Sequence, residues 1–205
     1  MTMSDFSSDQ RLYYPATQRN RDPILSVLHE VLPKKGRALE ISSGSGEHAV
    51  YFAQALPSIQ WVPSDPDPRC LASIESWRRV QPLPNLNSPL RLDVCQTWSI
   101  QHADAIVNIN MIHIAPWEAC IALFKGCADI LPKGGALFMY GPYRIGGEHT
   151  SESNRRFDQN LRDQNPQWGV RDLDEVINVA KRVGLSHQGT VEMPANNLSV
   201  IYQRD

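Results

Sequence analysis

Short apolar runs alternate with segments of helical periodicity along most of this chain, and this alternation constrains the fold more than any other feature. The runs predict strands at 37–41, 59–63, 90–94, 105–109 and 136–140. The periodic segments predict helices starting at Asp22-Pro23 and ending near Pro33, then at 48–56, 69–80, 118–131, 153–163 and 172–183. Strands that alternate with helices form a parallel sheet covered by helices on both faces. We therefore expect an α/β fold with a doubly wound sheet.

The end of the chain departs from this alternation. Two β-like runs, Ser186 to Met193 and Leu198 to Gln203, flank the turn-forming residues 194–197. Adjacent strands joined by a short turn form a hairpin, so the last strand should be antiparallel to the others. Five parallel strands and this hairpin give a Rossmann-like sheet of about seven strands. No boundary divides the chain, and residues 1–205 are expected to form a single domain.

Composition and charge exclude several classes of protein. The 205 residues carry a formal net charge of −2 and are 41% hydrophobic, which argues against a strongly basic nucleic-acid binder and against a disordered chain. The longest apolar stretch, Ala105 to Trp117, is shorter than the ~20 residues of a membrane span. The first twenty residues lack the apolar core of a signal peptide. A soluble, cytoplasmic protein is expected.

The cysteines and histidines do not form a metal-binding pattern. The four cysteines are scattered, and none lies in a C-x-x-C pair or near a histidine at zinc-ligand spacing. Cys120 and Cys127 share an apolar helical stripe and are interpreted as buried thiols. We expect no metal site.

A glycine-containing loop follows the first predicted strand and precedes a helix. The strand carries Glu40 near its end, and Gly44 and Gly46 lie in the turn. Glycines allow the backbone to approach a ligand closely, and the free N–H groups at the start of a helix favour an anionic or polar group. This loop indicates a nucleotide-type ligand, although a tight strand-to-helix turn without a ligand has the same local pattern.

Two aspartates follow the next strands of the predicted sheet. Asp65 comes nineteen residues after Gly46, where a carboxylate can accept hydrogen bonds from both ribose hydroxyls. Asp93, after the third strand, is placed for an adenine amino group. Either residue alone can equally be a turn or cap residue. Three features in order at the carboxyl ends of parallel strands predict a cofactor crevice there.

A nicotinamide cofactor is one interpretation of this crevice. The spacing Gly44-x-Gly46-x-x-Ala49 satisfies the dinucleotide-binding pattern. That interpretation gives no role to Asp93 or to the terminal hairpin. It also finds no Tyr-x-x-x-Lys pair, because Tyr140 is followed four residues later by Arg144.

The order Glu40-x-Ser42-x-Gly44-x-Gly46 instead resembles the first motif of class I S-adenosylmethionine-dependent methyltransferases. In that motif a glycine usually stands where this chain has Ser42. Further motifs resemble a domain-of-unknown-function family that includes methyltransferase-like protein 26, and the match runs from about residue 11 to 204. These motifs lie at 19–24, 110–117, 141–143, 150–154, 168–172 and 193–197. The family resemblance implies the methyltransferase fold and the cofactor S-adenosylmethionine.

The resemblance also implies roles for individual residues. Glu40 would order the loop, while Ser42, Gly44 and Gly46 would line the methionine and ribose of the cofactor. Asp65 would hold the ribose diol, and Asp93 and the backbone of Val94 would meet the adenine. Asn108 and Asn110 would face the methionine end, and Arg19 and Asn20 would close over the cofactor from the N-terminal segment.

Candidates for catalysis follow the fourth and fifth strands. His113 has the unperturbed pKa of a general base, and a structural histidine beside the Pro116-Trp117 turn is an equally good interpretation. Asn110 and Tyr143 are expected to position the acceptor. Secondary candidates are Glu148 and His149. Arg155, Arg156 and Arg162 are candidate anion-binding groups of a lid, and a solvated helix face explains them as well. Arg171 is a further lid candidate, but a role within the Trp168–Asp172 turn is the preferred interpretation for it.

The sequence therefore predicts a methyltransferase that acts on a small-molecule acceptor, with residues 1–22 and 141–170 as a lid. A non-catalytic S-adenosylmethionine-binding or partner-regulating module is the alternative, and an NAD(P)-dependent oxidoreductase is the third hypothesis. Nucleic acid is not an expected partner, because the charge is near neutral.

Overall fold

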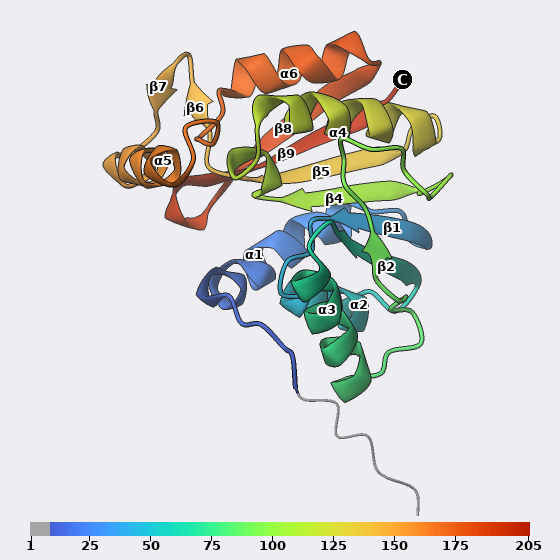
Figure 1. Ribbon diagram of the computed structural model, residues 1–205. Helices are drawn as coiled ribbons and strands as arrows, with labels where there is room; N and C mark the ends of the chain where they lie inside the picture. Colours follow the sequence, from blue (N-terminus) through green and yellow to red (C-terminus); the bar gives the residue numbers. More distant parts are fainter. Residues whose placement is uncertain (1–8) are drawn as a thin grey trace, which may run out of the picture.

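The computed structural model describes residues 9–205, which form a seven-stranded sheet with helices on both faces (Figure 1). The strand order is β3-β2-β1-β4-β5-β9-β8. The strands are β1 (Gly36–Ile41), β2 (Ile59–Asp65), β3 (Leu90–Arg91), β4 (Ala105–Ile109), β5 (Ala136–Gly141), β8 (Leu185–Met193) and β9 (Asn197–Arg204). β1 to β5 pair in parallel, and β9 is antiparallel to both of its neighbours. The predicted doubly wound, Rossmann-like sheet with an antiparallel C-terminal hairpin is confirmed.

Each face of the sheet carries its own layer of helices and its own apolar core. The first layer contains α1 (Pro15–Val31), α2 (Glu47–Ala55) and α3 (Pro68–Val80). The second contains α4 (Trp117–Ile130) and α6 (Leu173–Arg182). Side chains alternate along β1, so that Ala38 packs with the first layer and Leu39 with the second. Cys120 and Cys127 of α4 are buried free thiols, as predicted.

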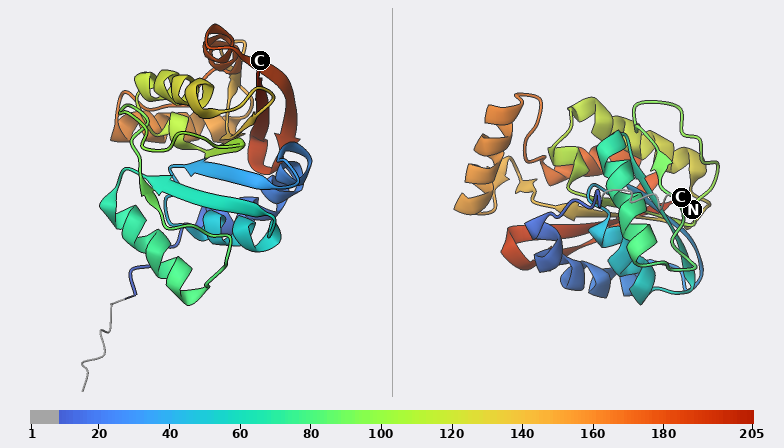
Figure 2. Two further views of the ribbon diagram at one scale, coloured as in Figure 1. Left: turned by 90° about the vertical axis from the view of Figure 1, so that its right-hand side faces the viewer. Right: turned by 60° about the horizontal axis from the view of Figure 1, so that its bottom comes forward.

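One helix stands apart from both layers. Helix α5 (Glu152–Gln164) lies beyond the carboxyl ends of the central strands, next to the short hairpin of β6 (Arg144–Ile145) and β7 (Glu148–His149) (Figure 2). The sequence predicted this helix but not the hairpin, whose turn holds Gly146 and Gly147 at positive φ. No helix in the described part of the chain is long and apolar enough to cross a membrane.

The predicted start of the first helix at Asp22-Pro23 is wrong. Helix α1 begins at Pro15, and Pro23 lies in its interior. Proline is well suited to the first turn, where no backbone N–H is required, so Pro15 is itself a starting signal. Pro23 leaves one carbonyl without its helical donor, but burial of Ile24 and Leu28 against the sheet holds the helix together across that position.

The third strand is shorter than predicted. It covers Leu90–Arg91 rather than 90–94. The backbone turns away after Arg91, and the Asp93 carboxylate accepts a hydrogen bond from the N–H of Cys95. Two single-turn 3-10 helices, Met111–His113 and Pro194–Asn196, complete the description of the chain.

Candidate cofactor cleft and acceptor cavity

The glycine loop turns through left-handed backbone conformations. Ser42, Gly44 and Gly46 have φ values of 56°, 57° and 89°. Glycine adopts such angles without steric cost, whereas a residue with a Cβ is strained by roughly 1–2 kcal/mol. Ser42 therefore carries strain at the position where the resembling motif has glycine.

Close packing is a second reason for a glycine at position 46. A Cβ on Gly46 would lie 2.9 Å from the Cα of Ile74 in α3. Glycine at this position lets α3 pack tightly against the start of α2. The loop is thus held between β1 and two helices.

Glu40 organises the base of the loop. Its carboxylate accepts a hydrogen bond of 2.9 Å from the indole N–H of Trp61 in β2, and its carbonyl accepts one of 2.7 Å from the Ser64 hydroxyl. Burial raises the pKa of the Glu40 carboxyl to about 7. Glu40 consequently links β1 to β2 directly beneath the turn.

Asp65 ends β2 with its carboxylate directed at the glycine loop. One carboxylate oxygen accepts a hydrogen bond of 2.9 Å from the N–H of Gly44, and the other accepts one of 2.9 Å from the N–H of Asp67. Its side chain is buried, and this burial raises the pKa of the carboxyl. The two predicted cofactor features, loop and carboxylate, are in direct contact.

Asp93 and Val94 lie one strand further along the same edge. The exposed Asp93 follows β3, which pairs with the end of β2 through Asp65 and Arg91. Val94 is half-buried and lines a cavity of about 520 Å³ between the loop after β3 and α4, together with Trp98 and Lys125. The structure therefore brings these residues to the predicted edge, but turns Val94 toward α4.

Two asparagines mark the end of β4, which neighbours β1 at the point where the strand order reverses. Asn108 is fully buried and donates a hydrogen bond of 3.2 Å to the carbonyl of Ile41. Its amide oxygen has no hydrogen-bond partner among the described residues. Asn110 adopts a left-handed conformation with φ 65°, and its N–H bonds to the carbonyl of Tyr140.

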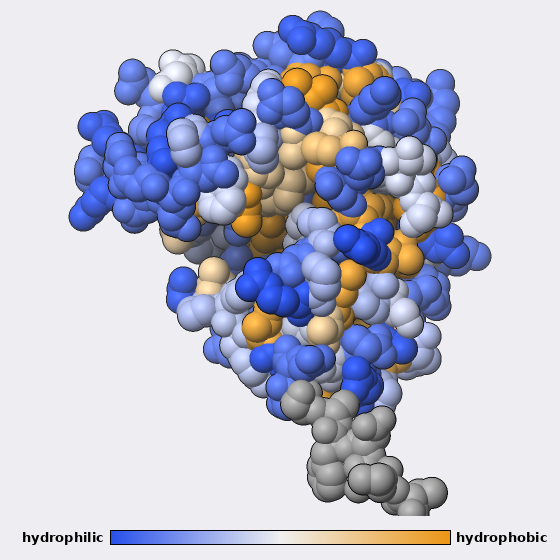
Figure 3. Space-filling view, in the orientation of Figure 1, coloured by the Kyte–Doolittle hydropathy of each residue, from blue (hydrophilic) through white to orange (hydrophobic). Residues whose placement is uncertain are grey.

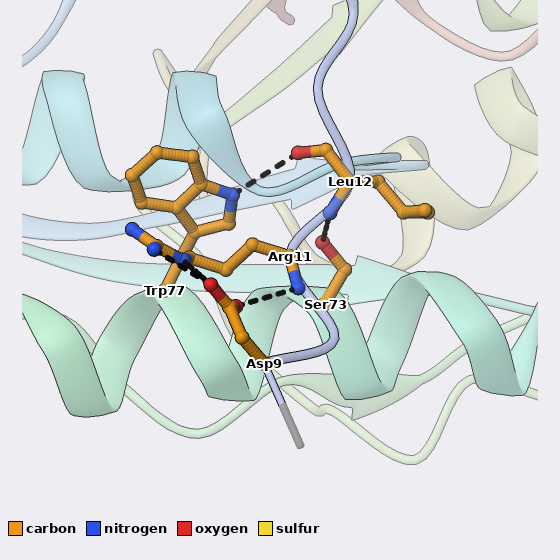
Figure 4. Close-up of polar contacts among 5 residues, drawn as sticks. All are labelled: Asp9, Arg11, Leu12, Ser73 and Trp77. Carbon is orange, nitrogen blue, oxygen red and sulfur yellow. Dashed lines mark hydrogen bonds and ion pairs between the residues drawn. The ribbon is translucent and has the colours of Figure 1, made fainter.

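The residues Asp9–Tyr14, which we call the N-terminal strap, cross α3 and the glycine loop. The Leu12 N–H donates to the Ser73 hydroxyl at 2.8 Å, and the Trp77 indole donates to the Leu12 carbonyl at 3.3 Å (Figure 4). The Arg11 guanidinium lies 4.8 Å from the centroid of the Trp77 ring, and it also pairs with Asp9. These contacts fix the strap along α3.

Tyr14 ends the strap above the loop. Its N–H donates a hydrogen bond of 2.7 Å to the Glu47 carboxylate, which also accepts from the Ser45 hydroxyl. A Cβ on Gly44 would lie 3.1 Å from the Tyr14 ring. Burial raises the pKa of the Tyr14 hydroxyl, with smaller contributions from Cys70 and Asp65. The ring therefore lies against Gly44.

The two other N-terminal candidates have different environments. The Asn20 amide oxygen makes a hydrogen bond of 2.8 Å with a ring nitrogen of His48, so Asn20 ties α1 to α2. Burial lowers the pKa of His48 to about 3. Arg19 is exposed and lines a cavity of about 440 Å³ together with Asn20 and Asn110.

The environment of His113 does not suit a general base. The side chain is fully buried, and burial lowers its pKa to about 3. Its Nδ1 accepts a hydrogen bond from the N–H of Arg171, which assigns the ring proton to Nε2. Tyr143 is also fully buried, with its ring edge-on to His113 at 5.1 Å, and burial raises the pKa of its hydroxyl well above the usual value. This geometry favours the structural interpretation of His113.

The secondary candidates are largely paired with other groups. The Arg171 side chain donates to the carbonyls of Ile112, Ala115 and Gln167. Arg155 and Arg156 pair with Glu152, while Arg162 and His149 lie beside Asp158. Glu148 is exposed in β7.

Sequence reasoning missed several residues of this region. Tyr14, Ser73 and Glu47 hold the strap on the loop, and Ala16, Tyr140 and Phe157 line the cavity next to Asn110. The exposed Tyr13-Tyr14 pair before Pro15 was the one available signal, because adjacent aromatic residues in a polar segment indicate a contact surface.

Three solved structures with a similar fold are named as methyltransferases or as O-methyltransferase family proteins. An O-methyltransferase family protein from Burkholderia thailandensis superposes with a TM-score of 0.79 at 15% identity, covering 93% of this chain and 57% of that one. An O-methyltransferase family 2 protein from Planctomyces limnophilus in complex with apigenin gives 0.78 at 15%, covering 93% and 60%. The SAH-bound form of CalO1, a methyltransferase in calicheamicin biosynthesis, gives 0.73 at 15%, covering 93% and 55%. This chain spans less than two thirds of each. It has the class I methyltransferase fold.

The family can also be stated. Residues 11–204 match the family described as "Protein of unknown function (DUF938)". The chain belongs to that family.

Proposed function

We propose that this protein is an S-adenosylmethionine-dependent methyltransferase that acts on a small molecule. One observation carries the proposal: the glycine loop, the Asp65 carboxylate and the end of β4 meet at the reversal point of a parallel sheet. Ligands of open α/β sheets bind at that point, outside the carboxyl ends of the strands.

The residues present fit the cofactor. Gly44 and Gly46 permit the positive-φ backbone of the loop, and Asp65 is held in place by two backbone N–H groups. Each carboxylate oxygen retains a second lone pair for a ribose hydroxyl. The buried, unpartnered amide oxygen of Asn108 offers an acceptor at the same edge, for a group such as the ammonium of the methionine moiety.

When bound, the cofactor supplies an electrophilic methyl group on its sulfonium sulfur. The protein's task is then to place the acceptor atom in line with that methyl group and to exclude water. Asn110 lies at the end of β4 and lines the adjoining cavity, so its amide is placed to orient an acceptor there. An acceptor that is already nucleophilic needs no base beyond such positioning.

Three expectations from the sequence remain predictions within this proposal. The predicted lid comprised residues 1–22, of which 1–8 lie outside the described residues, and residues 141–170; both segments are proposed to cover the bound cofactor and acceptor. A cytosolic location agrees with the four free cysteines. The resemblance to methyltransferase-like protein 26 also stays a prediction.

The comparisons support the proposal through what those proteins are named for. Each is named a methyltransferase or an O-methyltransferase family protein, one is in an SAH-bound form, and another is in complex with apigenin. These names favour S-adenosylmethionine over the nicotinamide cofactor of our third hypothesis.

A non-catalytic S-adenosylmethionine-binding module is the second candidate. It is favoured by the burial of His113 and Tyr143, the two titratable residues that the sequence nominated for catalysis. Such a module would bind the cofactor without converting it.

A turnover assay separates these two functions. The protein is incubated with S-adenosylmethionine and fractions of a small-metabolite extract, and formation of S-adenosylhomocysteine is measured. We expect at least one fraction to support turnover that Asp65→Ala loses and that Asp67→Ala, a change in a partly exposed helix cap, retains. Cofactor binding without turnover in every fraction would support the module. Turnover that is equal in the Asp65→Ala variant would contradict the proposed site.

A further inference from the structure

A concave site lies beside the edge of the sheet proposed to bind the cofactor. A cavity of about 440 Å³ lies between α1, α5, the ends of β4 and β5, and the turn between β8 and β9. In Figure 3 the surface is hollowed between the regions of α5 and α1, and apolar side chains show within the hollow. Five separate elements thus build one concave site.

The cavity lies where a methyl acceptor would have to be. Asn110, which lines it, follows β4 directly, and β4 pairs with β1, the strand that leads into the glycine loop. The cavity is large enough for a compact ring system but is close to the lower limit of ordinary ligand sites, about 300 Å³. Its position and size fit a small acceptor.

The cavity wall carries a positive charge and no negative one among the described residues. Among the described residues that line it, Arg19 alone carries a charge. Arg19 makes no ion pair with any described residue, unlike Arg155, Arg156, Arg162 and Arg171, which are paired or bonded to carbonyls. An unpaired guanidinium at the wall of a cavity is suited to bind a carboxylate in a bidentate manner.

The remaining walls are mostly apolar and flat. Phe157 of α5 is 40% exposed although it faces this cavity, and Pro142 and Pro194 add apolar surface. An exposed phenylalanine ring on a concave surface is suited to stack on a planar partner. These walls favour an aromatic body over a sugar or a flexible polar chain.

The far wall is held rigidly. The buried Asn154 amide donates to the Thr150 hydroxyl at 3.0 Å and to the Asn196 carbonyl at 2.8 Å, which ties α5 to the β8–β9 turn. Within that turn Ala195 has φ 57°, a left-handed conformation that is energetically unfavourable for alanine. Strain of this kind persists where the surroundings fix it, and it is concentrated at ligand sites.

We propose that this cavity binds the methyl acceptor, and that the acceptor is a small aromatic carboxylic acid whose carboxylate pairs with Arg19 while its ring packs on Phe157. The assignment of the bound molecule as methyl acceptor rests on the proposed function. The binding chemistry rests on the cavity itself.

The test uses three matched probes. The protein saturated with S-adenosylhomocysteine is titrated with 4-hydroxybenzoate, 4-hydroxybenzamide and cyclohexanecarboxylate, with binding followed by ligand-observed NMR. We expect 4-hydroxybenzoate to bind roughly tenfold more tightly than each of the other two, because the amide lacks the charge and cyclohexane lacks the planar ring.

Two variants locate the effect. In Arg19→Gln the preference for the benzoate over the benzamide should disappear, whereas Arg155→Gln, which alters an exposed arginine paired with Glu152, should retain it. In Phe157→Ala the preference for the aromatic acid over cyclohexanecarboxylate should disappear. Both residues are solvent-accessible, so unchanged melting temperatures are expected for each variant.

The outcomes distinguish this inference from the proposed function. Equal binding of benzoate and benzamide, no binding of any probe, or a preference unaffected by Arg19→Gln would overturn the inference, whether or not S-adenosylhomocysteine binds. Failure of S-adenosylhomocysteine to bind, with an Arg19-dependent benzoate preference intact, would overturn the proposed cofactor and leave the anion-binding cavity.

Discussion

His113 lies fully buried between the β4 end and the 168–172 turn, with Nδ1 bonded to the Arg171 N–H and its carbonyl bonded to the Gly169 N–H. A side chain in this position supports packing rather than proton transfer. His113→Ala should destabilise the fold by roughly 3 kcal/mol, or about 6–12 °C in melting temperature. Thermal unfolding measures this, with the exposed His29→Ala as the control.

The pH dependence of stability gives a second measurement on the same variant. The folded pKa of His113, about 3, is below the unfolded value of 6.5, so between these values only the unfolded chain binds the proton. Stability due to this group is therefore present above pH 6.5 and is lost as the pH falls toward 3. From pH 7 to 5, His113→Ala should lose about 2 kcal/mol less stability than the wild type. An unchanged melting temperature and pH profile, with turnover lost, would instead support His113 as the catalytic base.

Residue identities alone predicted part of the candidate cofactor site. Gly44 and Gly46 were found because left-handed backbone at a strand-to-helix turn requires glycine, and both have positive φ. The burial of a side chain could not be predicted in this way, because it depends on residues far away in the sequence. Nothing near His113 indicates that Arg171, fifty-eight positions later, covers it.

The N-terminal strap is an element without regular secondary structure whose position is set by side-chain contacts with α3. Tyr14 at its end faces Gly44, so its ring is placed to contact a ligand bound at the loop. Tyr14→Ala should weaken S-adenosylhomocysteine binding by about 1 kcal/mol, roughly fivefold in Kd. Because Tyr14 is 45% exposed, the melting temperature of the Tyr14→Ala variant should differ little from that of the wild type. Calorimetric titration tests this.

Tyr13→Ala is the matched control. Tyr13 is 56% exposed and packs edge-on to Trp77 at 5.2 Å, on the side of the strap that faces α3. The two variants remove the same side chain from neighbouring positions. Equal affinities for the two would show that the strap acts only as a packing element and would remove Tyr14 from the cofactor site.

Element boundaries were predicted well where one local signal dominates. β4, for example, has the predicted bounds, because its apolar run is bordered by polar residues. The start of α1 was misplaced because Asp22-Pro23 satisfies the local rule for a helix start, while tertiary packing extends the helix back to Pro15. The β6–β7 hairpin was missed because its two-residue strands are too short to show a periodic pattern.

At the scale of the whole molecule, the sheet topology determines where the proposed cofactor site lies. Asp65, Asn108 and the glycine loop come from three strands, and parallel pairing brings their carboxyl ends to one edge. This convergence was predictable because it follows from strand order. The cavity beside Asn110 could not be predicted from the sequence, because α1, α5 and the β8–β9 turn contribute to it from distant parts of the chain.

The central claim is that this edge of the sheet binds S-adenosylmethionine, and calorimetric titration with S-adenosylhomocysteine tests it most directly. The wild type should bind S-adenosylhomocysteine and not NAD. Asp65→Ala should lose about 1.5–3 kcal/mol of binding free energy, roughly 10- to 150-fold in Kd, because it removes charged hydrogen bonds to the ribose. Binding that is absent in the wild type, that is equal in Asp65→Ala, or that is tighter for NAD would contradict the account.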